Sequence, residues 1–127
     1  MSTSFTFQRE RANTLRATPG VVTRELRKLR PQGPSSFAIL TAPDGSYYQV
    51  AGGGGGMLVE KHLDGRHWRG CQEQPVVPFE DGTVLRVGAG RVRLRRNEWF
   101  RLDQVEELLV AVLGSESEPS WIMWTEI

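Results

Sequence analysis

Two Asp-Gly dipeptides, at residues 44–45 and 64–65, constrain the fold of this chain more than any other feature. Asp-Gly readily adopts the positive φ angles that tight hairpin turns require. Both dipeptides are flanked by short segments rich in aromatic and β-branched residues, which are typical of strands. The sequence therefore predicts four paired antiparallel strands, over residues 36–42, 46–52, 57–63 and 66–72.

The first of these hairpins admits two registers. A two-residue loop would place Ile39 opposite Val50, whereas a type I turn followed by a bulge at Gly45 would pair Ala42 with Ser46. A slip of one residue exchanges the buried and exposed faces of a strand. The sequence leaves both alternatives open.

The second hairpin has a defined register because a two-residue loop fits Asp64-Gly65. The predicted pairs are Leu63 with Arg66, His62 with His67, Lys61 with Trp68, and Glu60 with Arg69. We interpret the face that carries both histidines as an exposed polar surface with a cross-strand ion pair. Their spacing to Cys71 matches no zinc signature, so we expect no metal site and no cofactor.

The five glycines at 52–56 join the second predicted strand to the third. Phosphate-binding loops end at a helix and carry a Lys-Ser/Thr pair, but here a strand follows. We interpret the run as a flexible or bulged connection in which either close backbone approach or loop mobility matters.

Two amphipathic helices are predicted outside the hairpins. The first begins at the cap Thr18 and ends before Pro31, with an apolar stripe at Val22, Leu26 and Leu29. The second spans residues 103–113. We expect Asp103 and Glu106 to form its capping box and Gly114 to end it in a left-handed conformation.

Three further short strands are predicted, over residues 83–87, 91–95 and 120–126. The first follows Pro75 and Pro78, which disfavour a central strand, so we expect this segment to be an edge or a covering loop. The fold class is therefore α+β, with a mainly antiparallel, twisted sheet of about five to six strands and two helices packed on one face. A chain of 127 residues fits a single domain, and we expect residues 1–17 to form a loosely ordered N-terminal segment.

Several function classes are disfavoured by composition and motifs. The chain has no long apolar run, so we expect no membrane partner, and its start lacks the apolar core of a secretory signal. With a single cysteine, this favours a cytoplasmic location. None of the common hydrolase, metalloprotease or redox motifs occurs, so the chain is not expected to be an enzyme.

Arginines accumulate between residues 86 and 101, including Arg91, Arg93, Arg95 and Arg96. With Trp99 and Phe100 available to stack on bases, this cluster suggests a nucleic-acid-contacting module. A nucleic-acid-binding domain usually carries a clear basic excess, whereas the net charge of this chain is only +1. We therefore keep nucleic-acid contact as the alternative and favour a solvated basic face or an acidic protein partner.

The order of features resembles that of small immunity proteins of bacterial polymorphic-toxin systems, in particular the Imm1-like group. The resemblance covers roughly residues 19–127, through TPGVVTRELRKL, FAIL, DGSYYQVAGG and LVEKH, and then through a helix, Gly114, Pro119 and the terminal PSWIMWTEI. It implies a non-catalytic protein that binds one cognate toxin domain and blocks its active site or substrate entry.

Polar or aromatic residues near the exposed face or edge of the predicted sheet are the candidates for toxin contacts. They are Tyr47, Tyr48, Glu60, Arg69 and Trp121. Placement of the tyrosines and Trp121 in the core is the alternative. A free sheet edge would also permit a homodimer.

Overall fold

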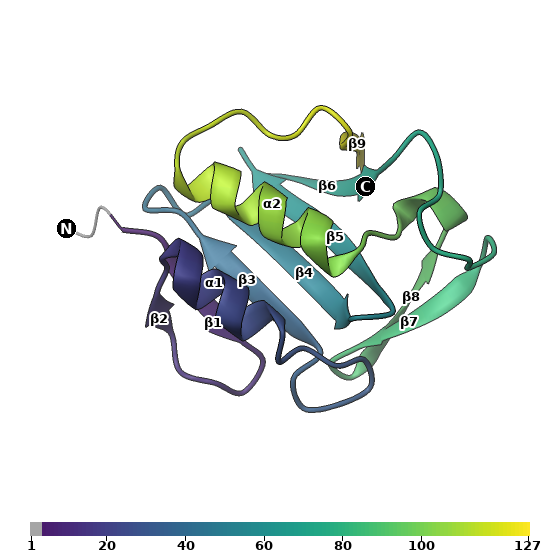
Figure 1. Cartoon of the computed structure of the whole chain (residues 1–127), viewed down its shortest axis with the longest axis horizontal. Helices are drawn as coiled ribbons and strands as arrows, with labels where there is room; N and C mark the ends of the chain where they lie inside the picture. Colours follow the sequence, from purple (N-terminus) through teal and green to yellow (C-terminus); the bar gives the residue numbers. More distant parts are fainter. Residues whose placement is uncertain (1–3) are drawn as a thin grey trace.

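The computed structural model describes residues 4–127 and centres on a seven-stranded antiparallel sheet with the order β2-β1-β3-β4-β5-β6-β9 (Figure 1). Its strands are β1 (Thr6–Arg9), β2 (Leu15–Arg16), β3 (Phe37–Thr41), β4 (Tyr47–Gly53), β5 (Gly56–Leu63), β6 (Arg66–Cys71) and β9 (Met123–Glu126). The last strand is shorter than expected, because residues 120–122 do not join it.

Two helices, α1 (Pro19–Leu26) and α2 (Leu102–Leu113), cover one face of the sheet (Figure 1). The Thr18 side chain caps α1 by accepting a hydrogen bond from the Val21 N–H, 3.1 Å away. The predicted stripe of α1 is buried in a core cluster that also contains α2 and strand residues. The predicted α+β class, with a mainly antiparallel sheet and two helices, is confirmed.

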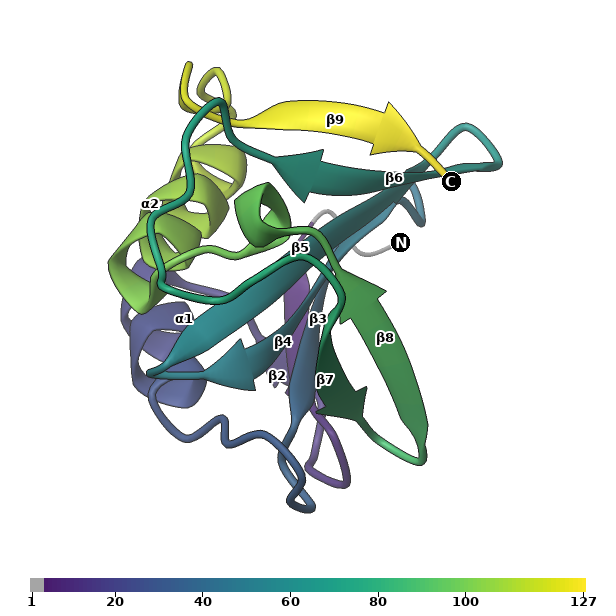
Figure 2. The same ribbon diagram turned by 90° about the vertical axis from the view of Figure 1, so that its right-hand side faces the viewer.

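A small hairpin of β7 (Thr83–Val87) and β8 (Gly90–Leu94) lies on the opposite face of the large sheet (Figure 2). Because side chains alternate along a strand, Val50 and Val59 face the helices while Ala51 and Leu58 face the hairpin. The turn of 3₁₀ helix η1 (Arg96–Glu98) then leads from β8 toward α2. The hairpin packs on Phe37, Ala51 and Leu58. We call this side of the sheet the open face, because neither α1 nor α2 covers it.

The N-terminal segment differs from the prediction. Residues 4–17 are not loosely ordered: β1 pairs along β3, and Phe7 is completely buried beneath the helices. Residues 1–3 of the predicted loose segment lie outside the described residues. The two N-terminal strands account for the larger sheet, because a strand of four residues carries too little pattern to be recognised in the sequence.

The two Asp-Gly turns settle both hairpin registers. In the first, the Ala42 N–H donates to the Ser46 carbonyl at 2.8 Å, and Gly45 has a φ of +90°. The alternative that pairs Ala42 with Ser46 is therefore the correct one. In the second hairpin all four predicted pairs are confirmed.

The ends of α2 differ from the predicted capping. The side chain of Gln104 accepts a hydrogen bond from the Arg101 N–H at 3.0 Å, so the box begins two residues earlier than the expected Asp103. Glu106 instead forms an ion pair with Arg27. At the other end Gly114 has a φ of −82°, and Ser115 adopts the left-handed conformation with a φ of +57°.

The glycine run forms a tight hairpin between β4 and β5, with Gly53 paired to Gly56 and only Gly54 and Gly55 in the turn. A Cβ on Gly56 would lie 2.8 Å from Trp99 Cε3. The backbone at Gly56 therefore approaches the Trp99 ring closely, which is one of the two reasons considered for the glycine run. The connection itself is a paired turn rather than a bulge.

Candidate binding surface

The open face of the large sheet carries two rows of side chains that the strand register aligns. One row runs through Tyr47, His62 and His67, which are direct cross-strand neighbours on β4, β5 and β6. The adjacent row consists of Gln49, Glu60, Arg69 and Thr125, on β4, β5, β6 and β9. We call these seven residues the open-face rows.

The first row is a cluster of three rings. The ring centroids of His62 and His67 lie 4.5 Å apart, and those of Tyr47 and His62 lie 5.0 Å apart. The Tyr47 hydroxyl is 3.2 Å from Nε2 of His67. Because the rings contact one another, each limits the rotation of its neighbours, and the row presents a partly ordered aromatic surface.

In the second row Arg69 and Glu60 form the predicted cross-strand ion pair. The guanidinium donates from both Nε and Nη2 to Oε2 of Glu60, at 2.9 Å and 2.8 Å. Both side chains are about one-fifth exposed. The pair therefore fixes the arginine in place while leaving part of it accessible to a partner.

The histidines and Cys71 do not come together as a metal site. Cys71 pairs with Met123, and its Sγ lies 4.0 Å from Oγ1 of Thr125. Among residues 4–127, no group of three or more His, Cys, Asp or Glu side chains is arranged to hold a metal ion.

Two of the five candidate contact residues lie on the other face of the sheet. The Tyr48 hydroxyl donates to Glu118, and the Trp121 ring packs on Phe100 with a centroid separation of 5.9 Å. The indole N–H of Trp121 also lies 3.4 Å from Glu107. The structure thus brings Tyr47, Glu60 and Arg69 onto one surface and separates Tyr48 and Trp121 from it.

Glu118 is the centre of a polar cluster that the sequence did not reveal. Its carboxylate accepts hydrogen bonds from the Tyr48 hydroxyl at 2.5 Å, the Trp124 indole at 2.9 Å and the Lys61 ammonium at 3.2 Å. The Lys61 ammonium also lies 4.2 Å from the centroid of the Trp124 ring.

These contacts shift two pKa values in opposite directions. Burial alone would raise the pKa of Glu118, but the hydrogen bonds from Tyr48 and Trp124 and the charge of Lys61 lower it below its usual value. Burial and the carboxylate of Glu118 raise the pKa of Tyr48. The cluster therefore holds a charged glutamate and a neutral tyrosine, which is a structural arrangement rather than a proton-transfer pair.

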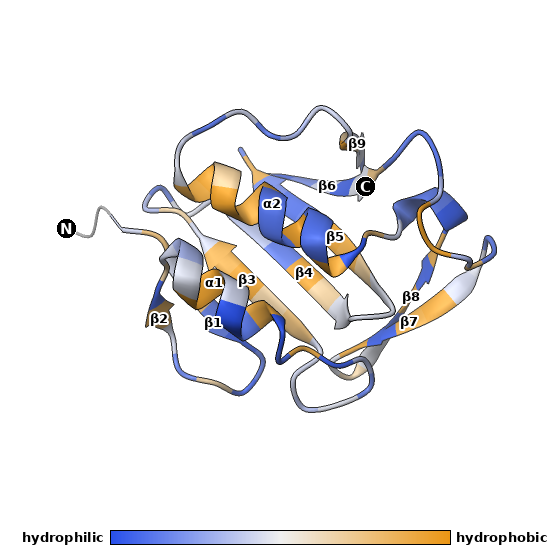
Figure 3. Cartoon of the chain, viewed as in Figure 1, coloured by the Kyte–Doolittle hydropathy of each residue, from blue (hydrophilic) through white to orange (hydrophobic). Residues whose placement is uncertain are grey.

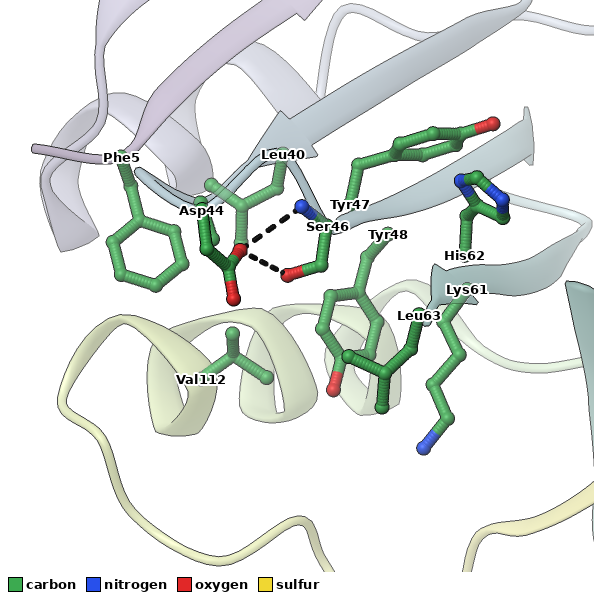
Figure 4. Close-up of a pocket in the computed structure, with 11 residues that line it drawn as sticks. Phe5, Leu40, Asp44, Ser46, Tyr47, Tyr48, Lys61, His62, Leu63 and Val112 are labelled. Carbon is green, nitrogen blue, oxygen red and sulfur yellow. Dashed lines mark hydrogen bonds between the residues drawn. The ribbon is translucent and has the colours of Figure 1, made fainter. Parts of the chain in front are cut away.

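A cavity of about 250 Å³ lies between the Asp44 turn and α2, on the helix-covered side of the sheet (Figure 4). Phe5, Leu40 and Val112 supply apolar walls, and Tyr47 forms part of its lining. Asp44 accepts two hydrogen bonds from Ser46, from its hydroxyl and its backbone N–H, and these lower the pKa of the carboxyl group. The cavity can accept one apolar side chain beside a carboxylate.

The arginine cluster lies on and beside the β7–β8 hairpin, where hydrophilic arginines alternate with hydrophobic residues along β8 (Figure 3). Arg91, Arg93, Arg95 and Arg96 are exposed, and within residues 4–127 none of them has an ion-pair partner. The expected base-stacking partners are not available, however. Trp99 is only 3% exposed and Phe100 is completely buried.

A groove of about 400 Å³ connects the hairpin to the open-face rows. Arg69 and Thr125 line it from the large sheet, and Arg93 and Arg95 line it from β8 and the residue that follows. The sequence suggested a solvated basic face for this segment, but only the packing of the hairpin on the sheet brings Arg93 to the same groove as Arg69.

Comparison with known proteins gives no relative: no protein-family model, curated protein or solved structure matches this chain. Within residues 4–127, no helix has the length and apolar character needed to cross a membrane.

Proposed function

We propose that this chain is a non-catalytic immunity protein that binds a cognate bacterial toxin domain in the cytoplasm and inhibits it, as the Imm1-like proteins do. The open face of the sheet is the supporting observation. Two helices back this face, so its side chains stand on a rigid platform, and Tyr47, Glu60 and Arg69 lie together on it.

The chemistry of this face suits protein recognition. Tyrosine and arginine are enriched among residues that dominate binding energy, because each combines a large contact area with directional hydrogen bonds. Here the Arg69 guanidinium is already oriented by Glu60 and the Tyr47 ring by two histidines. Less side-chain entropy is therefore lost when a partner docks.

The first experiment is co-expression with the product of the adjacent upstream reading frame, followed by affinity capture and a growth assay. A stable complex that relieves toxicity supports the proposal. Absence of both toxicity and complex contradicts it.

Arg69 and Arg66 provide a matched pair of variants because they lie on the same strand but on opposite faces of the sheet. R69A is expected to weaken the complex roughly tenfold or more, as truncation at the centre of an interface does. R66A should change the affinity less than about twofold. Equal affinities for both variants would show that the toxin does not contact the open-face rows at Arg69. Circular dichroism verifies that both variants fold.

A second candidate function is contact with nucleic acid through Arg91, Arg93, Arg95 and Arg96. It is supported by their exposure and by the absence of ion pairs to these side chains in the described chain. Neutralised phosphates release counterions, so binding of an oligonucleotide should fall steeply as salt rises. A flat salt dependence would exclude this function.

A further inference from the structure

We infer that the β7–β8 hairpin docks an acidic, partly apolar segment of the protein partner. The docking surface is the arginine face, which consists of Arg86, Arg91, Arg93 and Arg95. This inference rests on the proposed function and names the chemistry of the partner surface that meets the hairpin.

The arginine face brings positive charges close together without an acidic side chain to neutralise them within residues 4–127. Arg86 and Arg91 are directly opposite each other across the two strands, and like charges in that position destabilise a sheet. By contrast, Arg9, Arg24 and Lys28 are all neutralised by Glu25, which forms an ion pair with each of them. Within residues 4–127 no acidic side chain forms an ion pair with any member of the arginine face.

The arginine face is continuous with the open-face rows. The groove between them is lined by Arg93 and Arg95 on one side and by Arg69 on the other, so basic groups extend from the hairpin onto the large sheet. A partner that covers the open face can therefore extend a segment along this groove without leaving the surface. Carboxylates in that segment could pair with the three arginines that line the groove, Arg69, Arg93 and Arg95.

Neighbouring apolar side chains favour a protein segment over nucleic acid. Val84 and Ile127 are 41% and 58% exposed, and Ile127 lines the groove beside the arginines. With Trp99 and Phe100 buried, the hairpin offers neither of the stacking rings that the sequence suggested for single-stranded nucleic acid.

The test compares R93E with R16E, which reverses one exposed arginine on β2, near the other edge of the large sheet. Affinity for the purified toxin domain is measured by calorimetry at low and moderate salt. We expect R93E to weaken binding at least about tenfold and to reduce the salt dependence, and R16E to change affinity less than about twofold. Thermal melts verify that both variants fold.

Failure of this inference is distinguishable from failure of the proposed function. If the toxin binds and R93E equals R16E, the arginine face lies outside the interface and the inference is wrong while the function stands. If the toxin does not bind the wild-type chain, the proposed function fails.

In that second case, a fluorescein-labelled peptide of alternating Glu and Leu is compared with a single-stranded oligonucleotide of equal charge. Binding of the peptide, lost in R93E and retained in R16E, supports an acidic protein segment as the ligand. Binding of the oligonucleotide alone overturns the inference in favour of nucleic acid.

Discussion

The Tyr48 hydroxyl donates a 2.5 Å hydrogen bond to the carboxylate of Glu118, a residue 70 positions later in the chain. Glu118 belongs to the segment that leaves α2 and crosses back to β9 without regular secondary structure (Figure 1). Its carboxylate therefore anchors this segment to the large sheet and positions the edge strand.

Replacing Tyr48 with Phe should lower the free energy of unfolding by about 1–2 kcal/mol, because a hydrogen bond to a charged group is lost in a partly buried site. The matched control is Y47F, which alters the neighbouring residue on the open face. Its hydroxyl contacts the exposed His67, so a change below about 0.5 kcal/mol is expected. Urea denaturation measures both, and equal effects would contradict an anchoring role for Glu118.

Gly56→Ala should destabilise the fold by a few kcal/mol. A Cβ at this position would lie 2.8 Å from Trp99 Cε3 and 3.0 Å from Phe79 Cε2, so both packed rings would have to move. Gly55→Ala is the control, because its added Cβ meets nothing within 4 Å. We expect G55A to be neutral or slightly stabilising through reduced entropy of the unfolded chain. Similar melting temperatures for the two variants would show that the rings yield easily.

The sequence predicted features that are decided by a few neighbouring residues. The Asp64-Gly65 turn determines the register of its hairpin, so the shared face of Glu60, Arg69 and the two histidines followed directly. The first hairpin stayed ambiguous because two turn geometries satisfy the same dipeptide. The position of Tyr47 in that surface depends on its pairing with His62 across the glycine turn, which the sequence did not define.

Features that depend on long-range packing were not predictable. Strand β1 is recognisable only through its pairing with β3, since Phe7 alone marks its buried side. Tyr48 and Tyr47 look equivalent in the sequence, yet alternation places them on opposite faces. Nothing in the sequence around Glu118 indicates that Tyr48 and Lys61 converge on it.

Gln72 and Gln104 form a buried pair of amides that links β6 to α2. The Gln72 amide donates to the Trp99 carbonyl at 3.0 Å and to Oε1 of Gln104 at 3.1 Å, and Gln104 donates back at 2.9 Å. Gln104→Leu should cost about 1–3 kcal/mol, because it leaves Oε1 of Gln72 and the Arg101 N–H without the partners that Gln104 supplies.

The double variant Q72L/Q104L separates hydrogen bonding from packing. Removing both amides eliminates the unpaired group on Gln72, so the double variant should be less destabilised than the sum of the two single variants. Strictly additive losses in urea denaturation would show that the two amides contribute independently.

Glu25 should make folding stability depend on acid pH. Burial alone would raise its pKa, but hydrogen bonds from Arg9, Lys28 and Arg24 lower it from 4.5 to about 2 in the folded chain. Because the folded pKa is the lower one, the stabilisation is complete above about pH 4.5 and is lost as the pH falls toward 2. The difference between the two pKa values corresponds to about 3 kcal/mol at neutral pH.

Glu25→Gln should therefore be strongly destabilised relative to the wild type at pH 7, and this difference should shrink by more than half at pH 3. The control is E106Q, which removes the ion pair with Arg27, whose side chain is 65% exposed. Such surface pairs contribute at most about 1 kcal/mol, so E106Q should stay close to the wild type at both pH values. The difference in free energy of unfolding between E25Q and the wild type could instead be the same at pH 7 and pH 3. The stabilisation by Glu25 would then come from the shape of its side chain and not from its ionised carboxylate.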